Sequence, residues 1–176
     1  MKDSKQLKSS WDATPVWSFK EAEMEYISGV QVRKLRLIPD ERGWLMELLR
    51  SDWEEFEKFG QAYVTTCYPG VIKAWHYHKL QTDHFTGVSG LAKLVLYDNR
   101  KKSSTKGKVN EFYLGTLNPI LVKIPNGVYH GFTAVGKEMA MIVNFPTRTY
   151  NYEKPDEYRL PYDDPSVPYK WGVKMG

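Results

Sequence analysis

Between residues 60 and 145 the sequence repeats one pattern, in which short runs of alternating apolar and polar residues are separated by turn signals. The runs are QAYVTTCY, VIKAWHYH, HFTGVSG, LAKLVLYD, EFYLG, PILVKIP, YHGFTAV and MAMIVNF, and the signals between them include YPG, SSTKG, LNP, PNG and VGK. Alternation with period two is typical of half-buried strands. Many short strands at a spacing of about 8–12 residues favour a closed sandwich or barrel over βαβ units. We therefore predict an all-β fold.

The segments that flank this pattern predict its boundaries. Residues 1–26 are polar and irregular, as expected for an N-terminal arm, and residues 27–176 are predicted to form a single domain. ISGVQVRKLRLIP indicates a further strand, whereas SDWEEFEKFG, with an N-capping Ser51 or Asp52 and a terminal Gly60, predicts a short helix. The Tyr- and Pro-rich segment RTYNYEKPDEYRLPYDDPSVPYKWG is expected to wrap the domain as an extended C-terminal arm.

Composition limits the environment and the partners of the chain. A chain of 176 residues can bury a sizeable core without disulfides, and the single cysteine, Cys67, favours a reducing cytoplasm. No apolar run approaches the ~20 residues of a membrane span, so we expect no membrane partner. The net charge of +4 suits an anionic small ligand. The basic run NRKKSSTKGK is rich in Ser and Gly between strands, so we interpret it as a solvated loop and expect no nucleic-acid partner.

Three of the four histidines lie within nine residues of one another, and their spacing is informative. His76 and His78 share one face of a strand. The series Gly70, His76, His78, Asp83, Gly90 resembles the first signature of the cupins, with Asp in place of Glu, and PNGVYH resembles the second. This resemblance implies a cupin double-stranded jelly-roll barrel.

Four longer segments, in the same order along the chain, resemble the RmlC-like family of dTDP-4-dehydrorhamnose 3,5-epimerases. They are IPDERGWLMELL, GVIKAWHY, IPNGVYHGF and YNYEKPDEYRLPYDDPSVPYKW. The resemblance implies a sugar-nucleotide epimerase or isomerase that removes a proton beside the C4 ketone of a nucleotide-linked 4-keto-6-deoxyhexose. It implies no cofactor and no metal, a nucleotide-diphosphate sugar as substrate, and a homodimer formed by strand exchange around the DERG turn.

The resemblance also assigns roles to individual residues. His76 is the expected catalytic base, and a neutral imidazole suits that task. The expected substrate-binding residues are Arg42, Glu47, Lys73, His78 and His130. Strict alternation places Lys73 on the opposite strand face from His76, so Lys73 reaches the site only if a bulge intervenes. The epimerases tend to carry Gln where this chain has His78, and the H-x-H pair is similar to that of the related sugar-nucleotide 3,4-ketoisomerases.

The sequence departs from the family pattern at the general acid. The family carries a tyrosine on the strand after the second histidine, where this chain has Asn144, Phe145 or Pro146. Tyr152, in the C-terminal segment, is the expected substitute, and Tyr77, Tyr129 and Tyr150 are further candidates. A basic residue of the family is replaced by Asp83 or His84, and the family's Asp that supports the base has no clear counterpart.

Two alternatives to an enolising epimerase follow from the same residues. The first is a metal-dependent cupin enzyme in which His76, His78, Asp83 and His130 bind Fe, Mn, Ni or Zn. The second is a barrel that binds a nucleotide sugar but has lost catalysis together with the tyrosine.

Overall fold

The computed structural model describes residues 25–172, which fold into strands joined by turns and loops, with no helix among them. The twelve strands are β1 (Gln31–Lys34), β2 (Leu37–Asp40), β3 (Gly43–Met46), β4 (Tyr63–Cys67), β5 (Ile72–Tyr77), β6 (Asp83–Ser89), β7 (Leu91–Tyr97), β8 (Val109–Gly115), β9 (Ile120–Ile124), β10 (Tyr129–Ala134), β11 (Ala140–Asn144) and β12 (Tyr158–Arg159). Within this range there is consequently no helix that could cross a membrane.

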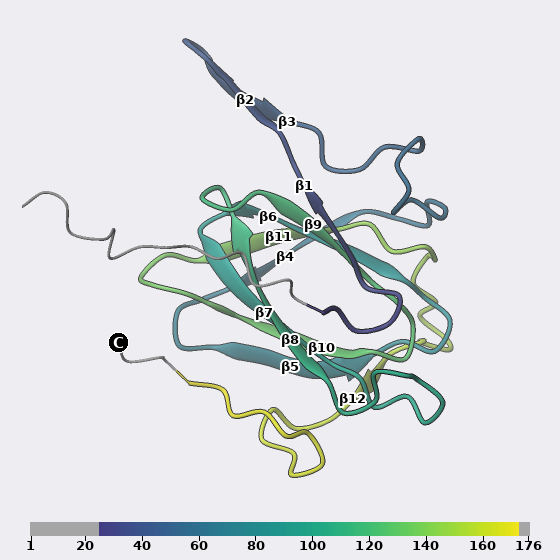
Figure 1. The fold of residues 1–176 in the computed structure, drawn as a ribbon. Helices are drawn as coiled ribbons and strands as arrows, with labels where there is room; N and C mark the ends of the chain where they lie inside the picture. The colour runs from purple at the N-terminus through teal and green to yellow at the C-terminus, as the bar shows by residue number, and fades with distance from the viewer. Residues whose placement is uncertain (1–24, 173–176) are drawn as a thin grey trace, which may run out of the picture.

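Ten of the strands form two antiparallel sheets, and β2 and β3 form a separate hairpin (Figure 1). One sheet has the order β1-β9-β6-β11-β4, and the other has the order β12-β5-β10-β7-β8. The main core contains buried side chains from both sheets, such as Phe85 and Ile142 from one and Leu94 and Phe132 from the other. The predicted all-β jelly roll is confirmed, and the eight alternating runs correspond to β4 to β11.

The C-terminal segment covers the outer face of the second sheet. Trp75 and Val95, on β5 and β7, pack with Val167 in a second buried cluster, against which Trp171 also lies. The indole N–H of Trp75 donates to the carbonyl of Tyr162 at 3.1 Å. Because β7 is covered on both faces, its sequence LAKLVLY is a nearly continuous apolar run. The expectation that this segment wraps the domain is confirmed for the residues up to 172.

The predicted short helix is wrong, because residues 51–60 form turns. The amide of Trp53 donates to the carbonyl of Arg50, and that of Phe56 to the carbonyl of Trp53, so the bonds span three residues and do not propagate. A ten-residue segment gains little helical stability by itself. Here tertiary contacts decide, because the Glu55 carboxylate pairs with Arg33 at 2.7 Å and the Glu55 carbonyl lies 2.8 Å from Nε2 of His84.

The division into an arm and a domain stays a prediction. Most of the proposed arm, residues 1–24, lies outside the described residues. The basic run 99–108 is a loop, as expected, and the Asp98 carboxylate beside it pairs with Arg100 at 2.9 Å.

Candidate active site

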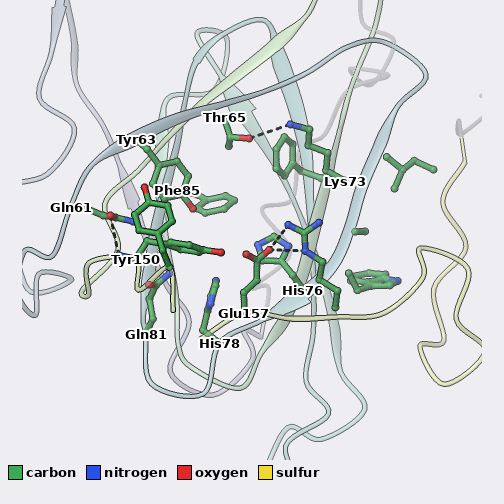
Figure 2. A pocket seen from close by; sticks show the side chains of 16 residues that line it. Gln61, Tyr63, Thr65, Lys73, His76, His78, Gln81, Phe85, Tyr150 and Glu157 are labelled. Carbon is green, nitrogen blue, oxygen red and sulfur yellow. Dashed lines mark hydrogen bonds and ion pairs between the residues drawn. The ribbon is translucent and has the colours of Figure 1, made fainter. Parts of the chain in front are cut away.

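A cavity of about 860 Å³ lies between the two sheets and holds most of the predicted site residues. Figure 2 shows Tyr63 and Tyr150 on one side of it and Lys73 and His76 on the other. The lining side chains come from β4, β5, β6, β10 and β12 and from the segments beside them: Gln61, Tyr63, Thr65, Ile72, Lys73, Ala74, Trp75, His76, His78, Gln81, Phe85, Phe132, Tyr150, Tyr152, Glu157 and Arg159.

Three histidines and one carboxylate cluster at the edge of this cavity: His76 and His78 line it, whereas the predicted binding residue His130 and the carboxylate of Asp83 are buried behind them. His76 and His130 are direct cross-strand partners on β5 and β10, and their ring centroids are 3.9 Å apart. His78 follows β5, and Asp83 begins β6. One ligand-type atom from each of the four residues lies within 4.8 Å of those of the others. The structure therefore brings together the histidines that the sequence spacing selected.

Asp83 is the centre of this cluster and is almost completely buried, with 1% of its surface exposed. Its Oδ2 lies 3.2 Å from Nε2 of His78 and 3.3 Å from Nε2 of His130. Its Oδ1 accepts hydrogen bonds from the side-chain amides of Gln81 at 2.8 Å and Asn144 at 2.9 Å. Burial raises the pKa of Asp83, but His130 and His78 lower it more, so the net shift is well below the usual value. Asp83 is therefore ionised.

Backbone carbonyls fix the ring orientations of His78 and His130 through the Nδ1 atoms, on the side of each ring away from Asp83. Nδ1 of His78 contacts the carbonyl of Asp156, and Nδ1 of His130 lies 3.1 Å from the carbonyl of Val128. Because a carbonyl only accepts, each Nδ1 carries the proton. Both Nε2 atoms are buried, face Asp83 and lack an aligned hydrogen-bond partner. They can hold a proton toward the carboxylate or offer a lone pair to a bound cation.

His76 and His78 differ in the direction of their pKa shifts. Burial, followed by the proximity of His130, lowers the pKa of His76 well below its ordinary value. Burial also opposes the charged form of His78, but the neighbouring Asp83 carboxylate outweighs it and raises the pKa of His78. At neutral pH His76 is therefore a neutral imidazole that can accept a proton, and it is adjacent to a histidine that favours its charged form.

Lys73 reaches the cavity because β5 contains a bulge. His130 pairs with His76, but two residues later Phe132 pairs with Lys73, so β5 has one extra residue between the two pairs. A side chain at Gly131 would collide with this bulge, since its Cβ would lie 2.2 Å from the Cβ of Ala74. The bulge places Lys73 and His76 in the lining of the same cavity. The bulge that Lys73 needs in order to reach the site is therefore present.

Arg42 and Glu47 do not line this cavity. Arg42 lies at the turn of the β2–β3 hairpin, its side chain is 84% exposed, and its ion pair is with Asp40. Glu47 follows β3 and pairs with Arg50 at 2.7 Å. The hairpin projects from the two main sheets (Figure 1). Within one chain, the structure does not bring these two predicted residues to the histidines.

The tyrosines considered as general acids are in different places. Tyr152 lines the cavity but is 88% exposed, and Tyr150 beside it is 43% exposed. Tyr77 and Tyr129 stack on each other with ring centroids 4.6 Å apart and are not among the lining residues.

Sequence reasoning missed several lining residues, among them Tyr63, Glu157 and Arg159. Alternation along β4 places Tyr63 on the same face as Thr65, but the sequence marks neither as a site residue, and only the structure shows that both line the cavity. Arg159 had no sequence signal either, since only the short pairing of β12 with β5 sets it opposite His76. Arg159 forms an ion pair with Glu157 at 2.6 Å, and with Lys73 it makes two cations in the lining.

His84 takes no part in the site. It is fully buried, and its two ring nitrogens lie 2.9 Å from the carbonyl of Phe145 and 2.8 Å from that of Glu55. It therefore fastens the 51–60 turns to β6.

Comparisons with known proteins agree with this geometry. A family model described as dTDP-4-dehydrorhamnose 3,5-epimerase matches residues 24–176. The spore coat polysaccharide biosynthesis protein SpsL of Bacillus subtilis is 45% identical over 149 residues, which cover 85% of this chain and 99% of that protein. The probable low-salt glycan biosynthesis epimerase Agl13 of Haloferax volcanii is 42% identical over 154 residues, covering 86% and 99%. The crystal structure of a dTDP sugar isomerase from Desulfovibrio desulfuricans G20 superimposes with a TM-score of 0.80 at 35% identity and covers 84% of this chain and 94% of that one.

Proposed function

Since the chain belongs to the dTDP-4-dehydrorhamnose 3,5-epimerase family, whose members are isomerases, we propose that it epimerises a nucleotide-linked 4-keto-6-deoxyhexose. The observation that carries this proposal is a neutral His76 in a large cavity that also contains Lys73 and Arg159. The relatives that are 45% and 42% identical, one named for polysaccharide and one for glycan biosynthesis, support a nucleotide sugar as substrate.

The reaction needs a base beside a stabilised enolate. The C4 carbonyl acidifies the protons on C3 and C5, and His76 removes one of them. Negative charge then develops on the C4 oxygen, where a cation or hydrogen-bond donor lowers the barrier most. Lys73 is the group assigned to that oxygen, because the β5 bulge turns it toward the same cavity as the base. Arg159 supplies a second positive charge, which suits a diphosphate.

His78 lines the cavity, and the buried Asp83 and His130 lie behind it. The ionised Asp83 holds the two imidazoles in fixed orientations and favours the charged form of His78. His78 is assigned to the binding of a sugar hydroxyl group, and His130, which does not reach the cavity, is assigned to holding Asp83 in place.

We assign Arg42 and Glu47 to the site of a second copy of the chain. Trp44 and Leu45, near Arg42 on the hairpin, are 50% and 58% exposed, and Leu45 pairs directly with Ile38, which is 43% exposed, so the hairpin presents neighbouring apolar side chains of the kind that mark an interaction surface. A homodimer that exchanges this hairpin would cover them and carry Arg42 to the partner's cavity. The cytoplasm is the location we expect, on the basis of the single thiol of Cys67.

The test is a calorimetric titration with a panel of nucleoside diphosphates, followed by NMR analysis of the 4-keto-6-deoxyhexose linked to the tightest binder. We expect binding of one nucleotide and formation of an epimer at C3, C5 or both. Nucleotide binding without conversion of any keto sugar would support the non-catalytic binding barrel instead.

A divalent metal centre is a second candidate, and the two orphaned Nε2 atoms of His78 and His130 favour it. With Asp83 and His76 they form a set of three imidazoles and one carboxylate that fits Fe, Mn, Ni or Zn, and the carbonyl contacts at Nδ1 orient both lone pairs. A bound cation would supply Lewis-acid chemistry to the adjoining cavity.

Elemental analysis of protein purified without chelators decides between the two candidates. A stoichiometric metal that is lost in His78→Ala would support the metal centre. Full epimerase activity in metal-free, EDTA-treated protein would contradict a catalytic role for it.

A further inference from the structure

Tyr63, which is 38% exposed, faces His76 from the opposite sheet. It begins β4, and the register of the β4–β11 pair places it directly beside Asn144. β4 belongs to one sheet and β5, with His76, to the other. In Figure 2 the two side chains lie on opposite sides of the cavity, and both are among its lining residues. An epimerisation that inverts a carbon needs its proton donor on the side opposite the base, and Tyr63 meets this requirement.

The hydrogen bonds of Asn144 determine what the Tyr63 hydroxyl can do. Asn144 is fully buried, and its Oδ1 accepts from the amide of His84 at 3.0 Å, which fixes the orientation of the side-chain amide. The two hydrogens on Nδ2 are then directed to Oδ1 of Asp83 and to Oη of Tyr63, each at 2.9 Å. Because the amide group donates, the oxygen of Tyr63 is the acceptor in this bond.

The proton of Tyr63 consequently remains available. No residue among 25–172 accepts a hydrogen bond from the Tyr63 hydroxyl, and that hydroxyl is anchored at its oxygen by Asn144. Burial, followed by the nearby negative charge of Asp83, raises the pKa of Tyr63 to about 12, so the hydroxyl keeps its proton at neutral pH. Tyr152 is 88% exposed, against 38% for Tyr63, and no hydrogen bond to another described residue holds the Tyr152 hydroxyl in place.

We propose that Tyr63 is the general acid that returns a proton to the substrate on the face opposite His76. This assignment rests on the proposed epimerase function. Asn144 occupies one of the three positions where the family pattern places its acid tyrosine, and the antiparallel pairing puts Tyr63 beside that position on the neighbouring strand. Side chains of such directly opposed residues lie about 5 Å apart at Cβ, so a tyrosine on β4 can reach the space that one on β11 would use.

The step balances without any further reagent. His76 takes the proton from C3 or C5, and the electrons of that C–H bond form the enolate. The enolate carbon then takes the proton of Tyr63 on its other face, the new C–H bond forms, and the C4 carbonyl returns. Tyr63 is left as a phenolate and His76 as an imidazolium. Solvent in the open cavity restores the proton to the first and removes it from the second.

The test compares Tyr63→Phe with wild type on dTDP-4-keto-6-deoxyglucose in D₂O. NMR follows two quantities: the inverted product, and deuterium in sugar that has not been inverted. Without its acid, His76 can still remove a proton and return a deuteron to the same face. We therefore expect inversion to fall by about 100-fold or more, while deuterium uptake without inversion continues.

Matched variants separate Tyr63 from its neighbours. Tyr152→Phe and Tyr150→Phe should keep the wild-type ratio of inversion to uptake, whatever their rates. The assignment would be overturned if Tyr63→Phe kept the wild-type ratio of inversion to deuterium uptake. It would also be overturned if this ratio fell in Tyr152→Phe instead. An equal fall of both quantities in a Tyr63→Phe protein with an unchanged Tm would also overturn it and indicate a role in binding. If wild type shows neither inversion nor uptake, the epimerase function itself fails, and the assignment with it.

Discussion

The histidine end of the cavity and the β2–β3 hairpin both carry residues expected to act on the substrate, but the first is buried and the second is exposed. Asp83 is 1% exposed, and four side chains contact its carboxylate at 3.3 Å or less. On the hairpin, Arg42 is 84% exposed and Trp44 is 50% exposed. We propose from this comparison that one chain assembles the groups for proton transfer, and that a second copy supplies the residues that recognise the nucleotide.

The largest expected effect is at the base. His76→Asn keeps a polar side chain of similar size but removes the proton acceptor, so kcat should fall by about 10³-fold, within the range for loss of a general base. Steady-state kinetics on the keto sugar, with an unchanged Tm as control for folding, measures this effect. Activity within about tenfold of wild type would show that another group removes the proton.

The next largest effect is on stability at the same end of the cavity. Asp83→Ala leaves the side chains of His78, His130, Gln81 and Asn144 without their shared acceptor. Removing one partner from a buried charged network costs about 3–5 kcal/mol of the free energy of unfolding. Urea denaturation measures this loss. A loss below about 1 kcal/mol would mean that solvent or a cation satisfies the cluster without Asp83.

A smaller effect is expected from the hairpin, and it is of a different kind. Trp44→Asp places a charge in the surface that we assign to the dimer, so the protein should become monomeric with its fold and Tm nearly unchanged. Analytical ultracentrifugation measures the mass, and activity should fall about tenfold or more because Arg42 no longer reaches a second cavity. Leu117→Asp is the matched control, since Leu117 is 89% exposed on the β8–β9 turn. A Trp44→Asp protein that stays dimeric and active would contradict the assignment of the hairpin to the dimer contact.

The smallest expected effect is the pH dependence of the base. Because the pKa of His76 is lowered in the folded protein, the imidazole stays neutral well below pH 6.5, where an ordinary histidine would be half protonated. We therefore expect kcat/KM of metal-free protein to change by less than about twofold between pH 7.5 and 6.5. Halving of kcat/KM with a midpoint near 6.5 would contradict the lowered pKa.

The same shift has a consequence for stability, with a definite sign. The unfolded chain binds a proton at His76 near pH 6.5, but the folded protein does so only at lower pH. The contribution of His76 to stability is therefore present above pH 6.5 and decreases as the pH falls below it. His76→Asn should remove this part of the pH dependence of urea unfolding.

Local sequence patterns predicted the strands well, because alternation depends only on neighbouring residues. The turns at 51–60 were not predictable in this way, since the contacts of Glu55 with Arg33 and His84 come from distant segments. Lys73 illustrates the same limit, because a bulge changes the face of a side chain and periodicity does not reveal it.

The site residues likewise fall into those that sequence spacing predicted and those that only the strand register brings together. His76, His78, Asp83 and His130 follow a spacing that the sequence displays, and the structure brings all four together. Tyr63 and Asn144 are 81 residues apart and become neighbours only through the register of β4 with β11. A search for a missing tyrosine on the expected strand could not find one on the neighbouring strand.

The central claim is that His76 removes a proton beside the C4 ketone of a nucleotide-linked sugar. The most direct measurement is NMR detection of solvent deuterium at C3 and C5 of dTDP- and GDP-4-keto-6-deoxyhexoses incubated with the protein in D₂O. The account predicts uptake at one or both carbons with wild type and at least about 10³-fold slower uptake with His76→Asn. Absence of uptake from every keto sugar by folded wild-type protein, or equal uptake by both proteins, would contradict it.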